Sequence, residues 1–128
     1  MLNRKLEAAV LTLPIGYFIV PFFFPDWLQS YFIIGAIVTM YAAPYLFFMG
    51  LPVSWWIQKR TNHILIALGL HGMAGAIGGA LAGWIFNEVP NSLLFIVIGL
   101  VYSLIYFGVD WLLGSTRFYK REVNGGNV

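Results

Sequence analysis

The segment NHILIALGLHGMAGAIGGALAGWIF, residues 62–86, contains no aspartate, glutamate, lysine or arginine. A helix needs about 20 apolar residues to cross the hydrocarbon core of a bilayer, which is roughly 30 Å thick. This segment is long enough to do so. Apart from His63 near its start, its one ionisable side chain is that of His71. It therefore predicts a transmembrane helix.

The rest of the chain divides into further apolar segments of similar length, at about 7–24, 28–50 and 92–114. Hydrophobic residues make up 60% of the 128 residues and charged residues only 9%, whereas about a quarter of a typical globular protein is charged. This composition excludes a water-soluble enzyme, a nucleic-acid-binding module and a disordered tail. We predict an all-α integral membrane bundle of four transmembrane helices in one domain, residues 1–128, ending in a short tail, 115–128.

The positions of the charges predict the orientation of this bundle. The two turns around Asp26 and Glu88 contain no lysine or arginine. Because cytoplasmic loops collect positive charge, we expect both termini on the cytoplasmic side of the cell membrane. Basic side chains at such a surface attract anionic lipid headgroups by about 1 kcal/mol each, and we expect this of all seven: Arg4, Lys5, Lys59, Arg60, Arg117, Lys120 and Arg121.

The second predicted span has an unusual end. Pro44 lies within it, and Gly50-Leu51-Pro52 is predicted to stop or bend the helix, because proline lacks the N–H that a helix uses. Residues 53–60 are amphipathic enough to lie in the headgroup layer. They form either an ordinary helix end with aromatic and basic anchors or a helix that gates or couples to another element.

Glycine recurs along one side of the third predicted span. In lipid, helices associate through close backbone contact, which small residues allow. The pattern predicts tight helix packing, against another span of this chain or against a second copy; a glycine-lined pore or hinge is the alternative. The residues concerned are Gly72, Gly75, Gly79 and Gly83.

Polar side chains within the spans predict a second feature, a polar cluster in the cytoplasmic half of the bundle. At 1.5 Å per residue, His71 lies about 12 Å and Asp110 about 6 Å from the inner ends of their spans, so they can meet directly or through a relay. The cluster has three interpretations: groups that satisfy one another, a proton or ion path, or a catalytic site. Its predicted members are His71, Asp110, Tyr106, Ser103 and Thr12.

Several chemistries have no support in the sequence. The chain has no cysteine, which excludes a disulfide scaffold, a thiolate zinc site and a thiol nucleophile. His71 is the one histidine deep in a span, so a structural metal site is not expected. No phosphate-binding loop or nucleophile motif is present, and we expect no cofactor.

The middle of the chain contains a series of short motifs, in the order Leu51-Pro52-Val53-Ser54, Lys59-Arg60, Leu70-His71-Gly72 and Gly75. Over roughly residues 45–85 this series resembles a group of small uncharacterised four-span membrane proteins of bacilli. In that group a Pro-Val-Ser element ends the second span, and a third span with histidine and glycine follows a basic loop. Trp55-Trp56 and the density of glycine depart from the pattern. The resemblance implies a bacterial inner-membrane protein and implies no activity or functional residue.

Together these features favour a membrane protein that acts through helix–helix association rather than catalysis. It would form a homo-oligomer or join another membrane protein, contact anionic lipids on the cytoplasmic side, and bind no nucleic acid. The alternative is a small channel or transporter with a polar path along His71, Asp110 and Tyr106. A lipid-modifying enzyme is the third hypothesis.

Overall fold

The computed structural model describes residues 2–24, 27–86 and 92–125, with the side chains of all but 27–29, 92 and 116–125. Every regular element in these ranges is helical, which confirms the predicted all-α fold for them. In chain order the elements are α1 (Leu2–Ile19), the 3₁₀ turn η1 (Val20–Phe23), α2 (Trp27–Tyr45), the π-helical turn η2 (Leu46–Gly50), α3 (Leu51–Arg60), α4 (Ile64–Ile85) and α5 (Ser92–Gly125).

Four helical segments within these ranges are long and apolar enough to cross a membrane: Leu2–Phe23, Ser30–Arg60, Ile64–Ile85 and Leu93–Ser115. Their outer surfaces carry large apolar side chains, and those of Phe48, Met40 and Leu65 are 78–80% exposed. Apolar surface on this scale marks contact with a partner or a membrane, because water solvates it poorly. The length and composition of the helices therefore support a location in a membrane.

The second span differs from the sequence prediction. Helix was expected to stop or bend at Gly50-Leu51-Pro52. The stop is wrong, because α2, η2 and α3 follow one another without a gap as far as Arg60. Within η2, the N–H of Leu51 donates to the carbonyl oxygen of Leu46, five residues earlier. Such a wide turn rearranges the backbone hydrogen bonds before Pro52, so the chain accommodates a proline that would disrupt a regular α-helix.

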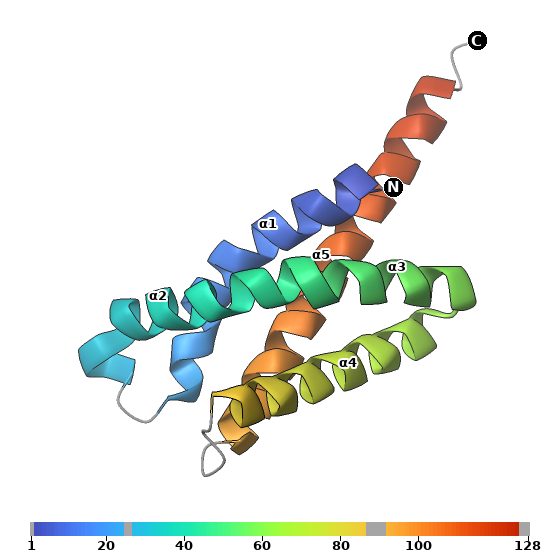
Figure 1. The fold of residues 1–128 in the computed structure, drawn as a ribbon. Coiled ribbons are helices and arrows are strands. Elements are labelled where there is room, and N and C mark those ends of the chain that lie inside the picture. The colour runs from blue at the N-terminus through green and yellow to red at the C-terminus, as the bar shows by residue number, and fades with distance from the viewer. Residues whose placement is uncertain (1, 25–26, 87–91, 126–128) are drawn as a thin grey trace.

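Figure 1 shows α2, η2 and α3 as one long element, with α4 returning beneath it and α5 crossing behind. The N-terminus and the turn between α3 and α4 lie on the right of this view, and the start of α2 and the end of α4 lie on the left. Helix α5 packs against both α1 and α4. It therefore connects α1 with α4, which are far apart in sequence.

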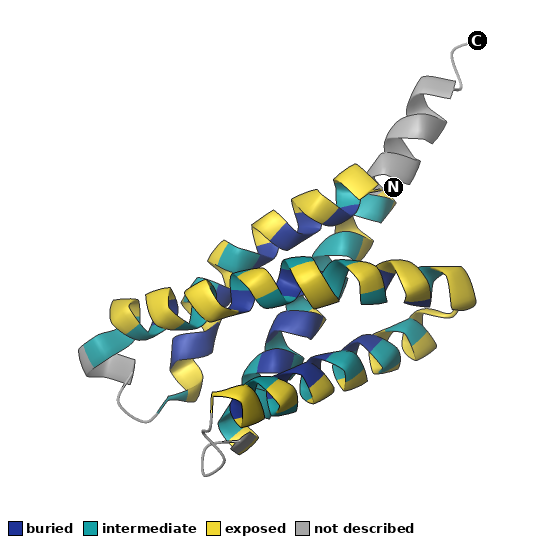
Figure 2. Ribbon diagram, viewed as in Figure 1, coloured by how far each residue is buried: buried dark blue, intermediate teal, exposed yellow. Residues whose placement is uncertain are grey.

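The two largest fully buried side chains are tyrosines of α5. Tyr102 and Tyr106 are each 1% exposed and pack with Ala8 and Ala9 of α1, both fully buried, and with Leu46 of η2. In Figure 2 the buried positions lie on the inner sides of the helices, and the outer sides are exposed. Small residues on α1 face large rings on α5, which lets the two helices interlock.

Glycines bring α4 and α5 into backbone contact. A Cβ atom at Gly79 would meet the backbone of Phe95 and Ile96, and one at Gly75 would meet the backbone of Gly99. Backbone atoms cannot move aside as a flexible side chain can, so both positions require glycine. Gly72 is less restricted, because its Cβ would lie 3.9 Å from Leu104, and Gly83 is buried.

Candidate functional site

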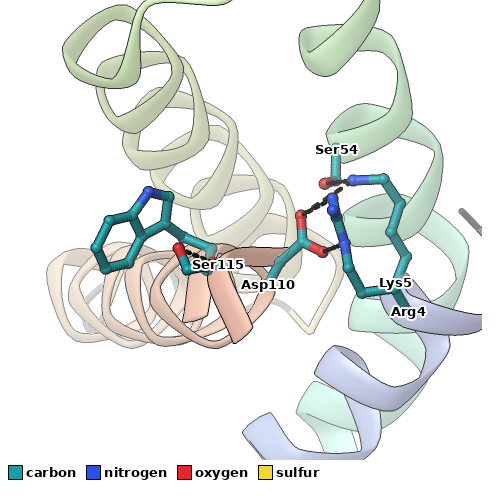
Figure 3. Close-up of polar contacts among 6 residues, drawn as sticks. Arg4, Lys5, Ser54, Asp110 and Ser115 are labelled. Carbon is teal, nitrogen blue, oxygen red and sulfur yellow. Dashed lines mark hydrogen bonds and ion pairs between the residues drawn. The ribbon is translucent and has the colours of Figure 1, made fainter. Parts of the chain in front are cut away.

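Three charged side chains and one serine meet where α1, α3 and α5 come together. Nε of Arg4 donates to Oδ1 of Asp110 at 2.8 Å, and Nη2 of Arg4 lies 3.3 Å from Oδ2. Nζ of Lys5 lies 3.2 Å from the same Oδ2 and 2.5 Å from Oγ of Ser54. Figure 3 shows the carboxylate of Asp110 turned toward the two cations of α1. We call Arg4, Lys5, Ser54 and Asp110 the ion-pair cluster.

The ion-pair cluster is largely withdrawn from the surface. The side chain of Lys5 is 2% exposed, that of Asp110 13% and that of Arg4 16%. Removing an ion from water costs several kcal/mol, so buried charges need partners. The two-point contact between a guanidinium and a carboxylate is a strong form of pairing. Without Asp110, two cations would face each other with no counter-charge among the cluster residues.

The sequence predicted other partners for these side chains. It expected Arg4 and Lys5 to meet lipid headgroups, and it grouped Asp110 with His71 and Tyr106. In the structure both cations contact Asp110, and Lys5 is too buried, at 1% exposure, to offer its ammonium group to the surface. Depth was the available signal, because Asp110 lies only about 6 Å from the inner end of its span, near the level of the basic start of α1.

His71 lies on α4 near the ion-pair cluster. Its Nδ1 is 2.8 Å from the carbonyl oxygen of Ala67, one turn earlier. The centre of its ring is 5.1 Å from that of Phe107 and 6.3 Å from that of Tyr106, both on α5. The hydroxyl of Ser103 donates to the backbone carbonyl of His71. This places three predicted cluster members, His71, Ser103 and Tyr106, along one seam between α4 and α5.

Thr12, the fifth predicted member, has a different role. Its hydroxyl donates to the carbonyl oxygen of Ala8 at 2.7 Å, within its own helix. Thr12 is fully buried, so this bond satisfies a hydroxyl that has no access to water. The contact joins Thr12 to α1 and not to the polar groups of α4 and α5.

A cavity of about 580 Å³ lies against the ion-pair cluster. It extends from Arg4, Lys5 and Asp110 to the turn at residues 61–63, and His71 forms part of its wall. Phe107 and Trp111 add an apolar side. Pockets for small ligands measure about 300–1,000 Å³ and combine apolar walls with a few polar groups. This cavity has both properties.

Two of the other predicted basic side chains, those of Lys59 and Arg60, are not part of the wall of this cavity. Nζ of Lys59 is 3.6 Å from the centre of the Trp55 ring, and the guanidinium carbon of Arg60 is 5.5 Å from the Trp56 ring. Both contacts are cation–π interactions on an exposed face of α3. The side chains of Arg117, Lys120 and Arg121 lie outside those that the structure describes.

The described residues contain no group of three or more histidine, aspartate or glutamate side chains that could hold a metal ion. In the cavity wall, His71 and His63 are accompanied by a single described carboxylate, that of Asp110. That carboxylate already contacts two cations. The arrangement is therefore better suited to hydrogen bonding and charge recognition than to metal coordination.

No protein-family model matches the chain, and no curated protein and no solved structure is significantly similar to it. The resemblance to small membrane proteins of bacilli stays a prediction. What the chain does must be argued from the geometry of the cavity and the ion-pair cluster.

Proposed function

We propose that this chain is a membrane-embedded binding protein whose cavity holds an anionic group, a phosphate or a carboxylate. The observation that carries the proposal is the charge of the cavity wall. Two cations, Arg4 and Lys5, share one carboxylate, that of Asp110, on the wall of a 580 Å³ cavity. The described part of the wall therefore has one more positive charge than negative, apart from its histidines.

Hydrogen-bonding capacity supports the same ligand chemistry. A guanidinium has five N–H donors and an ammonium has three, and neither can accept a hydrogen bond. Asp110 engages Nε and Nη2 of Arg4, and Asp110 and Ser54 together engage Lys5. An anion that entered the cavity could accept further N–H bonds from Arg4, and it would compete with Asp110 for both cations.

Two sources could supply this anionic group, the headgroup of an anionic lipid or a soluble anion. The apolar wall at Phe107 and Trp111 suits an amphiphile, because it offers a contact for the carbon atoms next to the headgroup. The polar turn at 61–63 suits either source. This end of the bundle also carries Arg4 and Lys5, and we expect it to face the cytoplasm.

Two other functions remain as candidates with less support. Helix association was the first expectation, but Gly75 and Gly79 face α5 of the same chain, so these two glycines supply no free surface for a second copy. Transport would require the cavity to communicate with the opposite membrane surface. Binding requires only the cavity itself.

Thermal unfolding in a neutral detergent tests the proposal. The protein is heated with inorganic phosphate, with short-chain phosphatidylglycerol, or with phosphatidylcholine of the same chain length. We expect phosphatidylglycerol to raise the unfolding temperature more than phosphatidylcholine. A rise with phosphate as well would indicate a soluble anion as the ligand. If neither anion raises it more than the neutral lipid does, the proposal is wrong.

Two variants should change anion binding in opposite directions, and a third is their control. Arg4→Gln should weaken binding of the anion by about tenfold or more, because a charge-assisted hydrogen bond is worth about 1.5–3 kcal/mol. Asp110→Asn should increase the stabilisation by the anion, because it removes the competing carboxylate. Lys59→Gln, on the exposed face of α3, is the control for the general attraction of a surface cation and should weaken binding much less than Arg4→Gln does. An equal loss in Lys59→Gln and Arg4→Gln would contradict a specific site.

A further inference from the structure

A second, much smaller cavity lies deeper in the bundle. Its volume is about 20 Å³, and its polar lining comes from Tyr45 of α2, His71 of α4, and Ser103 and Tyr106 of α5. His71 also belongs to the wall of the larger cavity. The imidazole therefore lies between the two cavities.

Two residues that line the small cavity each carry a buried polar atom that makes no hydrogen bond of regular geometry in the described protein. These atoms are Nε2 of His71 and the hydroxyl oxygen of Tyr106, which lies near Ser54 without a hydrogen bond of regular geometry to it. His71 is 6% exposed and Tyr106 1% exposed, so bulk solvent does not satisfy them. The other two hydroxyls at this cavity are engaged, because Tyr45 donates to the carbonyl oxygen of Ala74 and Ser103 donates to that of His71.

The hydrogen bond at Nδ1 of His71 determines whether Nε2 is a donor or an acceptor. A carbonyl oxygen can only accept a hydrogen bond. Nδ1 of His71 is therefore protonated and donates to the carbonyl oxygen of Ala67. In the neutral imidazole, Nε2 is then an acceptor without a donor. The hydroxyl of Tyr106 can donate or accept, yet it makes no direct bond to Nε2.

We propose that the small cavity is a binding site for one water molecule that joins Nε2 of His71 to the hydroxyl of Tyr106. A cavity needs about 10–15 Å³ of this kind of volume to hold a water molecule, and such a water needs two to four polar partners. A volume of about 20 Å³ is enough for one water and not for a larger solute. The water donates to Nε2 and bonds to the Tyr106 hydroxyl with its remaining groups.

This water site links the larger cavity to the centre of the bundle. The hydrogen-bonded series runs from the His71 imidazole, which borders the larger cavity, through the water to Tyr106 in the core. It also ties α4 to α5 at a depth where His71 and Tyr106 have no direct bond. The inference does not depend on whether the larger cavity binds an anion.

Solid-state NMR of the protein in phosphatidylcholine bilayers tests this inference. His63→Gln leaves His71 as the only histidine, so ring ¹⁵N labels report on it alone. We expect neutral His71 to be protonated at Nδ1, with magnetisation transfer from water protons to Nε2. Protonation at Nε2 instead of Nδ1, or an absence of transfer from water, would overturn the proposal.

Two further variants, made in the same His63→Gln background, separate this water from water in the larger cavity. Tyr106→Phe removes one of the two proposed partners, so transfer to Nε2 should fall by half or more and the Nε2 shift should change. Tyr41→Phe changes a tyrosine that is 55% exposed, and it should leave both signals unchanged. Equal transfer in the Tyr106→Phe and Tyr41→Phe variants would show that the water comes from the larger cavity and would refute the site. If Tyr106→Phe fails to fold, the protonation state of His71 and its transfer from water still decide the question.

Discussion

The contact between α4 and α5 and the ion-pair cluster hold the same bundle together by opposite means. At the first, Gly75 and Gly79 remove side chains, so that the backbones of two helices touch. At the second, long charged side chains of α1 reach Asp110 on α5. Helices in lipid gain little from the hydrophobic effect, so dispersion contacts and polar bonds must supply their association. Dispersion contacts join α4 to α5, and polar bonds join α1 to α5, so α5 takes part in both regions.

The comparison predicts that the charged region is the more sensitive to a single substitution. Asp110→Asn keeps the size of the side chain and leaves Arg4 and Lys5 without a counter-charge in the cluster. We expect the free energy of unfolding, measured in detergent, to fall by about 3–5 kcal/mol, as for other broken buried ion pairs. Lys59→Gln is the control, and because it removes only an exposed cation–π contact it should change the free energy of unfolding by about 0.5–1 kcal/mol at most. Equal effects of the two substitutions would show that the cluster does not stabilise the fold.

The contact between α4 and α5 should respond to a single methyl group. Gly79→Ala places a Cβ against the backbone of Phe95 and Ile96, so we expect a loss of about 1–3 kcal/mol. Gly69→Ala is the same chemical change on the same helix at a position with nothing within 4 Å, and it should be neutral or slightly stabilising. A comparison of the two unfolding free energies isolates the packing effect. If both variants are equally stable, the two backbones are not in contact.

Ser54→Ala tests how much the hydroxyl of Ser54 stabilises the buried ammonium group of Lys5. The serine is 1% exposed and its hydroxyl lies 2.5 Å from Nζ of Lys5. Its loss leaves the ammonium with the Asp110 contact, and we expect a cost of about 1.5 kcal/mol, at the lower end for a bond to a charged group. In a double variant, the changes in unfolding free energy caused by Ser54→Ala and Gly79→Ala should add. The changes caused by Ser54→Ala and Asp110→Asn should not add, because both residues contact Lys5.

Thr12→Val should have the smallest effect. The hydroxyl of Thr12 bonds to the carbonyl of Ala8 within α1, and valine keeps the shape of the side chain. The carbonyl oxygen of Ala8 keeps the N–H of Thr12 as its helical partner, so no buried group is left unsatisfied and we expect a change below about 0.5 kcal/mol. A loss of about 2 kcal/mol or more would return Thr12 to the polar cluster that the sequence predicted.

The apolar segments of the sequence predict the helices well because length and charge alone decide whether a helix can cross lipid. The continuation of helix through Pro52 was missed, because a proline predicts a disruption and not the π-helical turn that absorbs it. Depth along each span brought His71 and Tyr106 to one level, and their rings lie 6.3 Å apart. Depth also places Asp110 near the level of Arg4 and Lys5, but it does not decide between these cations and His71, because that choice depends on which side of α5 faces α1.

The contact between Lys5 and Asp110 in a lipid bilayer is the most direct test of this account. Dipolar recoupling between a ¹³C label in the aspartate carboxyl groups and ¹⁵N labels at Nζ of the lysines measures it, and Lys5→Met assigns the signal. We predict a coupling that agrees with the 3.2 Å separation of Nζ and Oδ2 and that disappears in Lys5→Met. If both labels are detected and no coupling is present in the original chain, the ion-pair cluster does not exist in the membrane. The proposed binding site would then be lost with it.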